Sequence, residues 1–344
     1  MKKIGINGLG RIGRTSLRVW WQYHRQEVSL NMINTSGSMD VDGWANLLKY
    51  DTNYGPFQGE IRYEQLKTSK EATPEDSLIG YIYLNDHKIA ITAQRDPALI
   101  PWGQYGIETV LESTGAFLDT KTAGGHLTGG AQKVIISAAA KDKDIPLYVL
   151  GVKGDDGSHN ITSNASCTTN CSAPIIMIMN REFGIEKAML NTTHSYTDDQ
   201  NLQDNSHKDP RRSRNAARNI VPTTTNAATA VAEVVPEVKG IFDGVSMRVP
   251  TSTGSISDIV MLLKRNVTIE EVNAALIKAS EGELKGILAV TNDPVVSSDI
   301  VGRRESSIVD LELTNVVADN LVRVVSWYDN EFGYCNRLVE QACA

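Results

Sequence analysis

Two residues in the middle of the chain have side chains suited to covalent chemistry. Cys167 lies in the segment SNASCTTNC, residues 163–171, just before the apolar run 175–179 that is typical of a helix. A thiol at a helix N-terminus lies near free backbone amides and the positive end of the helix dipole, which favour the thiolate. His194 follows a β-rich run and precedes a long polar segment. A histidine brought beside such a thiol can accept its proton, so the two residues predict a nucleophile and its base.

The chain has four cysteines, which are Cys167, Cys171, Cys335 and Cys343. They are too sparse for a disulfide framework, so we expect reduced thiols. Cys167 and Cys171 have no second close pair and no histidine at finger-like spacing, so we predict no metal site. A lone cysteine is often an inert core residue, and only the partnership with His194 favours a catalytic role for Cys167.

A glycine-rich turn follows the first strand-like run. Gly8, Gly10 and Gly13, with Arg11 and Ile12 between them, stand after residues 3–7 and before a helical pattern. Glycines at this spacing allow a tight turn, close approach of a pyrophosphate to backbone amides, and packing of the helix on the strand. The segment predicts a dinucleotide site.

The end of the second strand bears on which dinucleotide is bound. NAD sites usually place a carboxylate there for the ribose 2′-hydroxyl. This chain has Asn34, Thr35, Ser36 and Ser38, with no carboxylate before Asp40. The hydroxyl groups of Thr35, Ser36 and Ser38 could donate to a 2′-phosphate, but this stretch contains no Arg or Lys. NAD and NADP both remain open.

Strand-like runs alternate with helical stretches in the first part of the chain, which predicts a Rossmann-type, doubly wound parallel sheet. These runs are 3–7, 28–34, 88–92, 109–113, 133–137 and 147–152. Later runs rich in Val, Ile, Leu and Thr predict an α+β part built on a mostly antiparallel sheet, at 188–194, 245–249, 258–263 and 321–327. The polar stretch 195–219 is predicted to be a long, ordered, functional loop.

The length of 344 residues favours two domains. We expect residues 1–166, completed by 330–344, to bind the dinucleotide, and 167–329 to form the catalytic domain. The net charge of −7 argues against a nucleic-acid partner. The segment 1–7 lacks the apolar stretch of a secretion signal and no segment is apolar enough to span a membrane, so we expect a cytoplasmic protein with no membrane partner.

Six motifs, in order, give the chain a family resemblance. They are INGLGRIGR at 6–14, LLKYDTNYG at 47–55, SNASCTTNC at 163–171, HSYT at 194–197, MRVPT at 247–251 and SWYDNEFGY at 326–334. Together they resemble the phosphorylating glyceraldehyde-3-phosphate dehydrogenases, nearly from end to end.

The resemblance implies a mechanism. The Cys167 thiolate adds to the aldehyde, His194 takes a proton as hydride passes to the nicotinamide, and inorganic phosphate attacks the resulting thioester to give 1,3-bisphosphoglycerate. The ordinary pKa of histidine, about 6.5, would suit His194 to both proton transfers.

The resemblance also assigns binding residues. It gives Thr197 and Arg248 to the substrate phosphate, Ser166, Thr168 and Thr225 to the attacking phosphate, and Arg212 to a place near both. On the cofactor side it gives Arg11 and Ile12 to the pyrophosphate, Arg95 to the adenine side, Ser137 to the nicotinamide side, and Asn330 to the carboxamide. It further implies a homotetramer, with the 196–218 loop close to a neighbouring subunit's cofactor.

One segment departs from the family pattern. The family commonly has Thr-Gly-Ala-Ala-Lys where residues 225–229 read Thr-Asn-Ala-Ala-Thr. Asn226 and Thr229 therefore alter the expected pocket of the attacking phosphate and remove a positive charge. Two alternatives remain: an erythrose-4-phosphate dehydrogenase, which often uses water as acyl acceptor, and a non-catalytic binding protein on the same fold, against which the intact Cys167 and His194 argue.

Overall fold

The computed structural model describes all 344 residues, and its contacts divide them into two compact units. The first unit comprises Met1–Tyr148, Asp155–Ala165 and Cys335–Ala344. The second comprises Val149–Gly154 and Ser166–Tyr334. The chain crosses between the units at 148/149, 154/155, 165/166 and 334/335. The sequence predicted the domain boundaries at 166/167 and 329/330.

The first unit is built on an eight-stranded sheet in the order β10-β9-β8-β1-β2-β7-β6-β5. Adjacent strands from β10 to β7 pair in parallel, and β6 and β5 extend the sheet as antiparallel strands. The strands are β1 Lys2–Asn7, β2 Val28–Thr35, β5 Ile61–Gln65, β6 Leu78–Leu84, β7 His87–Ala93, β8 Thr109–Glu112, β9 Lys133–Ile136 and β10 Ile161–Ser163. This arrangement confirms the predicted Rossmann sheet.

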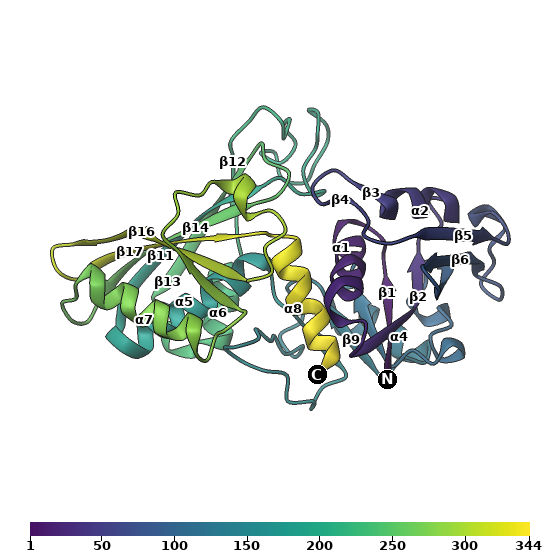
Figure 1. Cartoon of the computed structure of the whole chain (residues 1–344), viewed down its shortest axis with the longest axis horizontal. Coiled ribbons are helices and arrows are strands. Elements are labelled where there is room, and N and C mark those ends of the chain that lie inside the picture. The colour runs from purple at the N-terminus through teal and green to yellow at the C-terminus, as the bar shows by residue number, and fades with distance from the viewer. The chain divides into compact units, whose positions relative to one another are not determined.

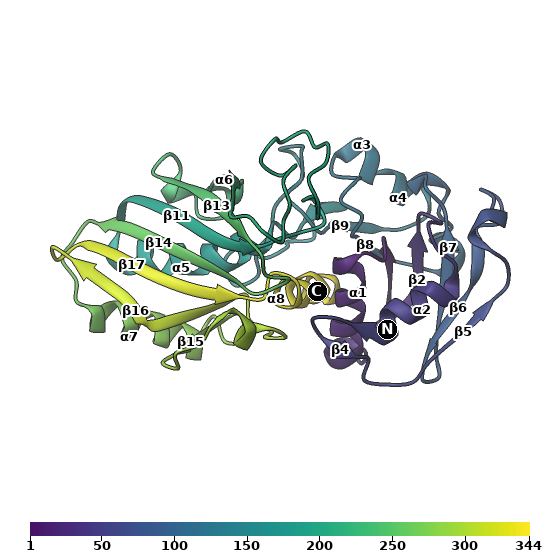
Figure 2. The same ribbon diagram turned by 90° about the horizontal axis from the view of Figure 1, so that it is seen from above.

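Helices cover both faces of this sheet, as Figure 2 shows for α1 on one side and for α3 and α4 on the other. The helices of the unit are α1 Arg11–Val19, α2 Val41–Lys49, α3 Thr120–Ala123, α4 Gly125–Thr128 and most of α8, Phe332–Cys343. A π-helical turn, Trp20–His24, continues α1, and a small hairpin joins β3, Tyr50–Asp51, to β4, Gly55–Pro56. Fully buried side chains such as Trp102 and Val110 fill the space between sheet and helices.

The prediction of a strand at 147–152 is wrong. Leu147 makes only an isolated bridge to Ser163, and the chain then turns back so that Val149 pairs with Lys153. Gly151 lies in this turn with a left-handed backbone, φ +83°. A turn this tight cannot extend a strand, and Ile161–Ser163 instead takes the sheet edge as β10.

The second unit is built on a seven-stranded sheet in the order β12-β13-β11-β14-β17-β16-β15. Its strands are β11 Ile185–Ser195, β12 Val221–Thr224, β13 Phe242–Val249, β14 Ser255–Leu263, β15 Leu288–Thr291, β16 Ser307–Val317 and β17 Leu321–Tyr328. β11 with β13 and β15 with β16 pair in parallel, and the other neighbours are antiparallel. The predicted mostly antiparallel sheet is confirmed.

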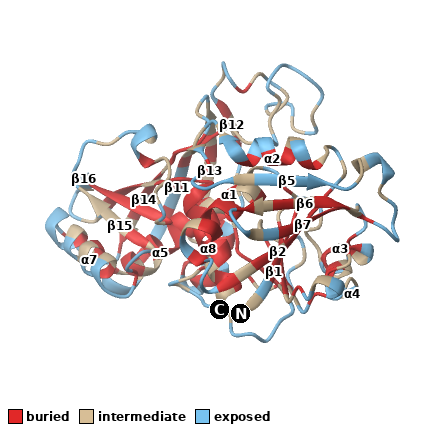
Figure 3. Cartoon of the chain, turned by 45° about the vertical axis from the view of Figure 1, so that its right-hand side comes forward, coloured by how far each residue is buried: buried red, intermediate tan, exposed pale blue.

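Three helices lie along one face of this sheet, as Figure 1 shows: α5 Cys167–Phe183, α6 Ala227–Val234 and α7 Ile269–Glu281. Side chains alternate between the faces along β11, so that Leu190 and His194 are buried while Met189 is exposed. Figure 3 shows the buried residues concentrated in the strands and in the covered sides of the helices. The stretch between Ser195 and Val221 contains no helix or strand, as predicted. None of the helices combines the length and apolarity needed to cross a membrane.

Candidate active site

Helix α5 places Cys167 at its first position. The Ser166 side chain caps the helix by accepting a hydrogen bond from the Thr169 amide at 3.1 Å. The residue before the cap, Ala165, is buried and has a left-handed backbone, φ +58°, which is strained for a residue with a Cβ. The sharp entry into the helix leaves the Cys167 amide without an intrahelical partner, beside its own sulfur. Cys167 as a residue is partly exposed.

Cys167 and His194 are in hydrogen-bond contact, with Sγ 3.3 Å from Nε2. The other ring nitrogen, Nδ1, lies 2.7 Å from the backbone oxygen of Ser195. A carbonyl oxygen only accepts, so Nδ1 carries the proton and donates it. Nε2 is then the lone-pair nitrogen that faces the sulfur, which is the tautomer a base for this thiol requires.

Tyr328, at the end of β17, completes this arrangement, although the sequence did not single it out as a site residue. Its ring packs edge-on against the His194 imidazole, with centroids 5.9 Å apart at 71°. Its hydroxyl bonds to the hydroxyls of Thr168 and Thr192 at 3.0 and 2.8 Å. Tyr328 thus joins the first turn of α5 to β11. Only one signal for Tyr328 was present in the sequence, its place within the motif SWYDNEFGY. The motif does not indicate that this side chain reaches Thr168 and Thr192, which are far away in the chain.

Burial sets the protonation state of the pair. Burial, reinforced by the Arg248 charge, lowers the pKa of His194 to about 3, far from the ordinary value expected from sequence. Burial raises the pKa of Cys167, although Arg248 and the Thr168 hydrogen bonds act in the opposite direction. Both effects favour a neutral thiol beside a neutral imidazole. A thiolate at Cys167 would therefore form by proton transfer to His194 Nε2.

Cys171, one helical turn beyond Cys167, has a different environment. It is fully buried, with its sulfur 3.7 Å from the hydroxyl of Ser307. Burial raises the pKa of Cys171 to about 11, so this thiol stays protonated. All four cysteines are free, as expected.

Arg248 lies beside Cys167 and His194 because of the strand register. β11 and β13 run in parallel with His194 opposite Arg248. The Arg248 Nη1 atom donates to Thr197 Oγ1 at 3.0 Å and to the Ser195 oxygen at 3.3 Å, and its buried Nε has no partner. A guanidinium held in this way can turn its remaining donors to a phosphate. The structure brings together Thr197 and Arg248, the two residues expected to share one phosphate.

Arg212 is held within its own loop by acidic partners that the sequence reading did not include. It forms a short ion pair with Asp199 and donates from Nε to Thr223 Oγ1 at 2.9 Å. The Asp209 carboxylate lies 3.5 Å from the same Nε. These carboxylates fix the Arg212 guanidinium and offset part of its charge.

The hydroxyls expected around the attacking phosphate already have partners. Ser166 Oγ caps α5 and bonds to Thr169 Oγ1, and Thr168 Oγ1 bonds to Tyr328. Thr225 Oγ1 accepts from the Ala227 amide at the start of α6. Asn226, the residue before α6, is exposed and makes no side-chain cap.

In the first unit, the glycine turn has the geometry of a phosphate cradle. Gly8 has φ +92°, and its amide donates to the Asn34 oxygen at 2.9 Å. A Cβ on Gly13 would lie 2.0 Å from the Gly8 oxygen, whereas one on Gly10 would meet nothing within 4 Å. Gly13 thus lets α1 pack against the turn, and Gly10 leaves open space at a helix N-terminus that has no side-chain cap. Arg11 and Ile12 open this helix, and the Arg11 side chain turns away to pair with Asp51 at 2.6 Å.

The side chains of Asn34 and Thr35, at the end of β2, already form hydrogen bonds with residues of the neighbouring strands. The Asn34 amide donates to Asn7 Oδ1 and accepts from Thr92 Oγ1, both at 2.8 Å. Thr35 Oγ1 is buried and donates to the Thr92 oxygen at 3.0 Å, so it does not offer the free hydroxyl that the sequence suggested. The stretch from Asn34 to Ser38 contains no Arg or Lys, but the fold brings Arg95 to it. The Arg95 Nε atom donates to the Ser36 oxygen at 3.2 Å and so places a positive charge beside the end of β2.

The two remaining expected cofactor contacts belong to different units. Ser137 follows β9 in the first unit, where its amide donates to the Glu112 oxygen at 3.0 Å. Asn330 follows β17 in the second unit, and its Oδ1 accepts from the Gly254 amide and the Ser255 hydroxyl at 3.2 and 2.9 Å. These bonds orient the Asn330 amide and leave its NH₂ group as a donor.

Comparisons with known proteins identify the relatives of the chain. Residues 2–120 match the sequence model described as glyceraldehyde 3-phosphate dehydrogenase, NAD binding domain, and residues 166–330 match the one described as its C-terminal domain. Glyceraldehyde-3-phosphate dehydrogenase 1 of Bacillus cereus is 47% identical over 345 residues, covering 99% of this chain and 98% of the relative.

Two other relatives also match the chain over nearly its full length. Glyceraldehyde-3-phosphate dehydrogenase A, chloroplastic, of Chlamydomonas reinhardtii is 45% identical, over 99% of this chain and 87% of its own. Glyceraldehyde-3-phosphate dehydrogenase of Mycolicibacterium smegmatis is 46% identical, over 98% of this chain and 96% of its own. The chain belongs to the glyceraldehyde-3-phosphate dehydrogenase family.

Proposed function

We propose that this protein oxidises glyceraldehyde 3-phosphate to 1,3-bisphosphoglycerate, with NAD or NADP and inorganic phosphate as co-substrates. The observation that carries the proposal is the 3.3 Å contact between Cys167 Sγ and His194 Nε2, in the tautomer that accepts the thiol proton. Arg248 and Thr197, on the adjoining strand and loop, supply donors for the substrate phosphate.

The first half of the reaction oxidises the aldehyde on the enzyme. His194 takes the thiol proton as the sulfur bonds to the carbonyl carbon, and the oxygen that gains charge is stabilised by the free Cys167 amide. The protonated His194 returns this proton to the oxygen, which gives a neutral thiohemiacetal and a neutral imidazole. His194 then accepts that hydroxyl proton while the carbon loses hydride, leaving a thioester. A nicotinamide cofactor, when bound, would supply the hydride acceptor.

The second half releases the product. A phosphate oxygen attacks the thioester carbon, the carbon–sulfur bond breaks, and the leaving thiolate recovers a proton from His194. Arg212, held by Asp199 and Thr223, is the side chain we assign to the attacking phosphate, together with the hydroxyls of Ser166, Thr168 and Thr225. These hydroxyls would have to exchange partners to receive it.

The cofactor binds, in this proposal, at the turn where Gly10 leaves open space and Gly13 permits close packing. Amides at the start of α1 would receive the pyrophosphate, and Asn330 would donate to the carboxamide and so fix the ring face. Ser137 and Arg95 would contact the nicotinamide and adenine sides. The Arg95 guanidinium beside Ser36 favours acceptance of a 2′-phosphate.

The test is a hydride-transfer assay with glyceraldehyde 3-phosphate, run with NAD and with NADP, each with and without phosphate. We expect phosphate-dependent reduction of at least one cofactor, and no turnover by Cys167→Ser with unchanged cofactor binding. Absence of turnover in every combination would reject the activity. Appreciable turnover by Cys167→Ser would show that the nucleophile is misassigned.

One observation keeps erythrose 4-phosphate as a second candidate substrate, with water as acyl acceptor. Asn226 and Thr229 are both exposed at the start of α6 and neither carries a positive charge. A pocket with less positive charge attracts phosphate less strongly. Comparing the turnover of both aldehydes with and without phosphate distinguishes the two reactions.

We propose that the protein forms a homotetramer in the cytoplasm. The face of the second sheet opposite α5, α6 and α7 has no helix on it, and it exposes the paired Met189 and Val260 by 59% and 37%. Exposed apolar side chains on such a face suit contact with another subunit. Light scattering that gave the mass of a single chain would reject the tetramer, and the absence of the protein from the cytoplasmic fraction of its cell would reject the location.

A further inference from the structure

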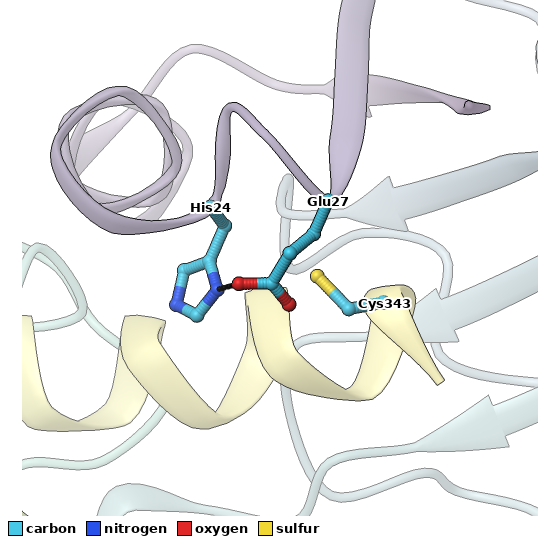
Figure 4. Close-up of side chains that lie close together, drawn as sticks. All are labelled: His24, Glu27 and Cys343. Carbon is cyan, nitrogen blue, oxygen red and sulfur yellow. Dashed lines mark hydrogen bonds and ion pairs between the residues drawn. The ribbon is translucent and has the colours of Figure 1, made fainter.

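Three residues with metal-ligating side chains meet in the first unit, away from the glycine turn. His24 ends the π-helical turn after α1, Glu27 precedes β2, and Cys343 is the last residue of α8. Figure 4 shows the Glu27 carboxylate between the His24 imidazole and the Cys343 thiol. One ligand atom from each residue lies within 4.8 Å of the other two.

The spacing of these atoms is close to that of a tetrahedral zinc site. Bond lengths of about 2.0–2.3 Å to N, O and S place neighbouring ligand atoms roughly 3.3–3.6 Å apart. The His24 Nδ1 and Glu27 Oε1 atoms are 3.0 Å apart, and no pair exceeds 4.8 Å. Side-chain shifts of about 1 Å would bring all three around one ion.

His24 has one ring nitrogen turned toward the other two side chains. The residue is 5% exposed, and its Nδ1 atom lies 3.0 Å from Glu27 Oε1, so Nδ1 is the nitrogen that would bind an ion. The Nε2 atom, on the other side of the ring, is buried without a hydrogen-bond partner. The helix widens to a π-turn at this residue, a distortion that is frequent at functional sites.

The surroundings give an ion both access and a suitable charge. The Glu27 side chain is 54% exposed and Cys343 is only partly buried, so the cluster reaches solvent. A cation that bound the Cys343 sulfur would displace the thiol proton to solvent. The Glu27 carboxylate and the Cys343 thiolate would then balance a divalent charge.

We propose that His24, Glu27 and Cys343 bind a divalent ion of the zinc class, with water in the fourth position. The ion would join the last turn of α8 to the segment between α1 and β2. Gln341 lies two residues before Cys343. Its Oε1 atom accepts a hydrogen bond from Asn164 Nδ2 at 2.8 Å, and its Nε2 atom donates to Thr162 Oγ1 at 3.1 Å. A metal-anchored α8 would therefore stabilise the packing of this helix in the first unit, independently of the chemistry at Cys167.

Cobalt(II) is the probe for this site, because a cobalt–thiolate bond gives a charge-transfer absorption. The full-length protein is titrated in a Cys167→Ser background, which removes the catalytic thiol as a competing ligand. Cys343→Ser removes the sulfur, and His24→Phe keeps a ring of similar shape without a ligand atom. Glu340→Gln is the matched control, since it removes a neighbouring carboxylate of α8 that pairs with Arg337 and lies outside the cluster.

We expect one cobalt ion per chain with a thiolate band in the Cys167→Ser protein and in its Glu340→Gln derivative. Cys343→Ser should abolish the band, and both Cys343→Ser and His24→Phe should weaken binding by at least about tenfold. Zinc should raise the melting temperature of the parent protein and not that of the two ligand variants.

Two results would overturn the proposal: no thiolate band in the Cys167→Ser protein, or equal cobalt affinity after Cys343→Ser. Circular dichroism checks the fold of each variant. If Cys343→Ser fails to fold, the affinity and band of His24→Phe decide, and unchanged values there reject the site.

Discussion

Replacing His194 with asparagine tests the neutral thiol–imidazole pair directly. The asparagine NH₂ group can take the place of Nδ1 and keep the hydrogen bond to the Ser195 oxygen, which is 2.7 Å long in the native protein. No atom then remains at the position of Nε2, 3.3 Å from the sulfur. The variant removes the base while preserving the local backbone contact.

The expected loss follows from what that base contributes. A positioned base accelerates a step by about 10²–10⁴-fold, or roughly 3–5 kcal/mol of barrier. Without it the thiolate must form unaided, from a thiol whose pKa is raised by burial. The residual rate should therefore rise by about tenfold for each pH unit below that pKa.

The native enzyme should respond to pH differently. Since burial and Arg248 lower the pKa of His194 to about 3, the imidazole is the neutral base throughout the neutral and mildly acidic range. Protonation, which inactivates the base, occurs only as pH falls toward that value. The acid limb of kcat/KM assigned to His194 should therefore lie well below pH 6.5.

Both predictions are tested by measuring the pre-steady-state rate of reduced-cofactor formation from pH 5 to 9, for the native enzyme and for His194→Asn. Exposed His159 provides the control, and His159→Asn should behave as the native enzyme does. A rate of His194→Asn within about tenfold of native at neutral pH would refute the role of His194 as the base. A native acid limb near pH 6.5 would refute the lowered pKa of His194.

Three further predictions concern binding. Arg248→Lys loses the guanidinium and its hydrogen bond from Nη1 to Thr197, and should raise the KM for glyceraldehyde 3-phosphate by about 10–100-fold, since a charge-assisted hydrogen bond contributes roughly 1.5–3 kcal/mol; an unchanged KM would contradict this role. Arg95→Ala should weaken NADP binding by a similar factor and NAD binding much less, as measured by fluorescence titration. Equal losses of affinity for the two cofactors would place Arg95 away from the 2′ position of the ribose. Thr229→Lys combined with Asn226→Gly should lower the KM for phosphate by up to about fivefold, the effect of one exposed charge; no change would mean that residues 226 and 229 do not affect phosphate binding.

Much of the fold was predictable, because its strands carry period-two or continuous apolar patterns. The glycine turn, the parallel strands that follow it, and β11 and β14 were all expected from sequence. β5 was missed because Ile61–Gln65 is mostly exposed and polar, as an edge strand can be. The false strand at 147–152 has the right composition but contains Gly151, whose left-handed backbone folds it back.

The sequence predicted which residues form the candidate site better than it predicted their protonation states and contacts. Motifs placed Cys167 and His194, but the shift in the His194 pKa depends on burial and on a neighbour across the sheet, which spacing along the chain does not reveal. Tyr328 and Asp199 contact the site through bonds that only the folded chain defines. Likewise, Arg95 is brought to Ser36 by the pairing of β2 with β7.

The contrast between Cys167 and Cys171 has a practical consequence for chemical labelling. A thiol-reactive probe meets Cys167, which is partly exposed and has a base beside its sulfur, and one helical turn away Cys171, which is fully buried. Mild alkylation of the native protein should therefore attach a reporter at a single position of α5 without replacement of Cys171. An aldehyde or a bound cofactor could then be followed as a change in the rate of that modification.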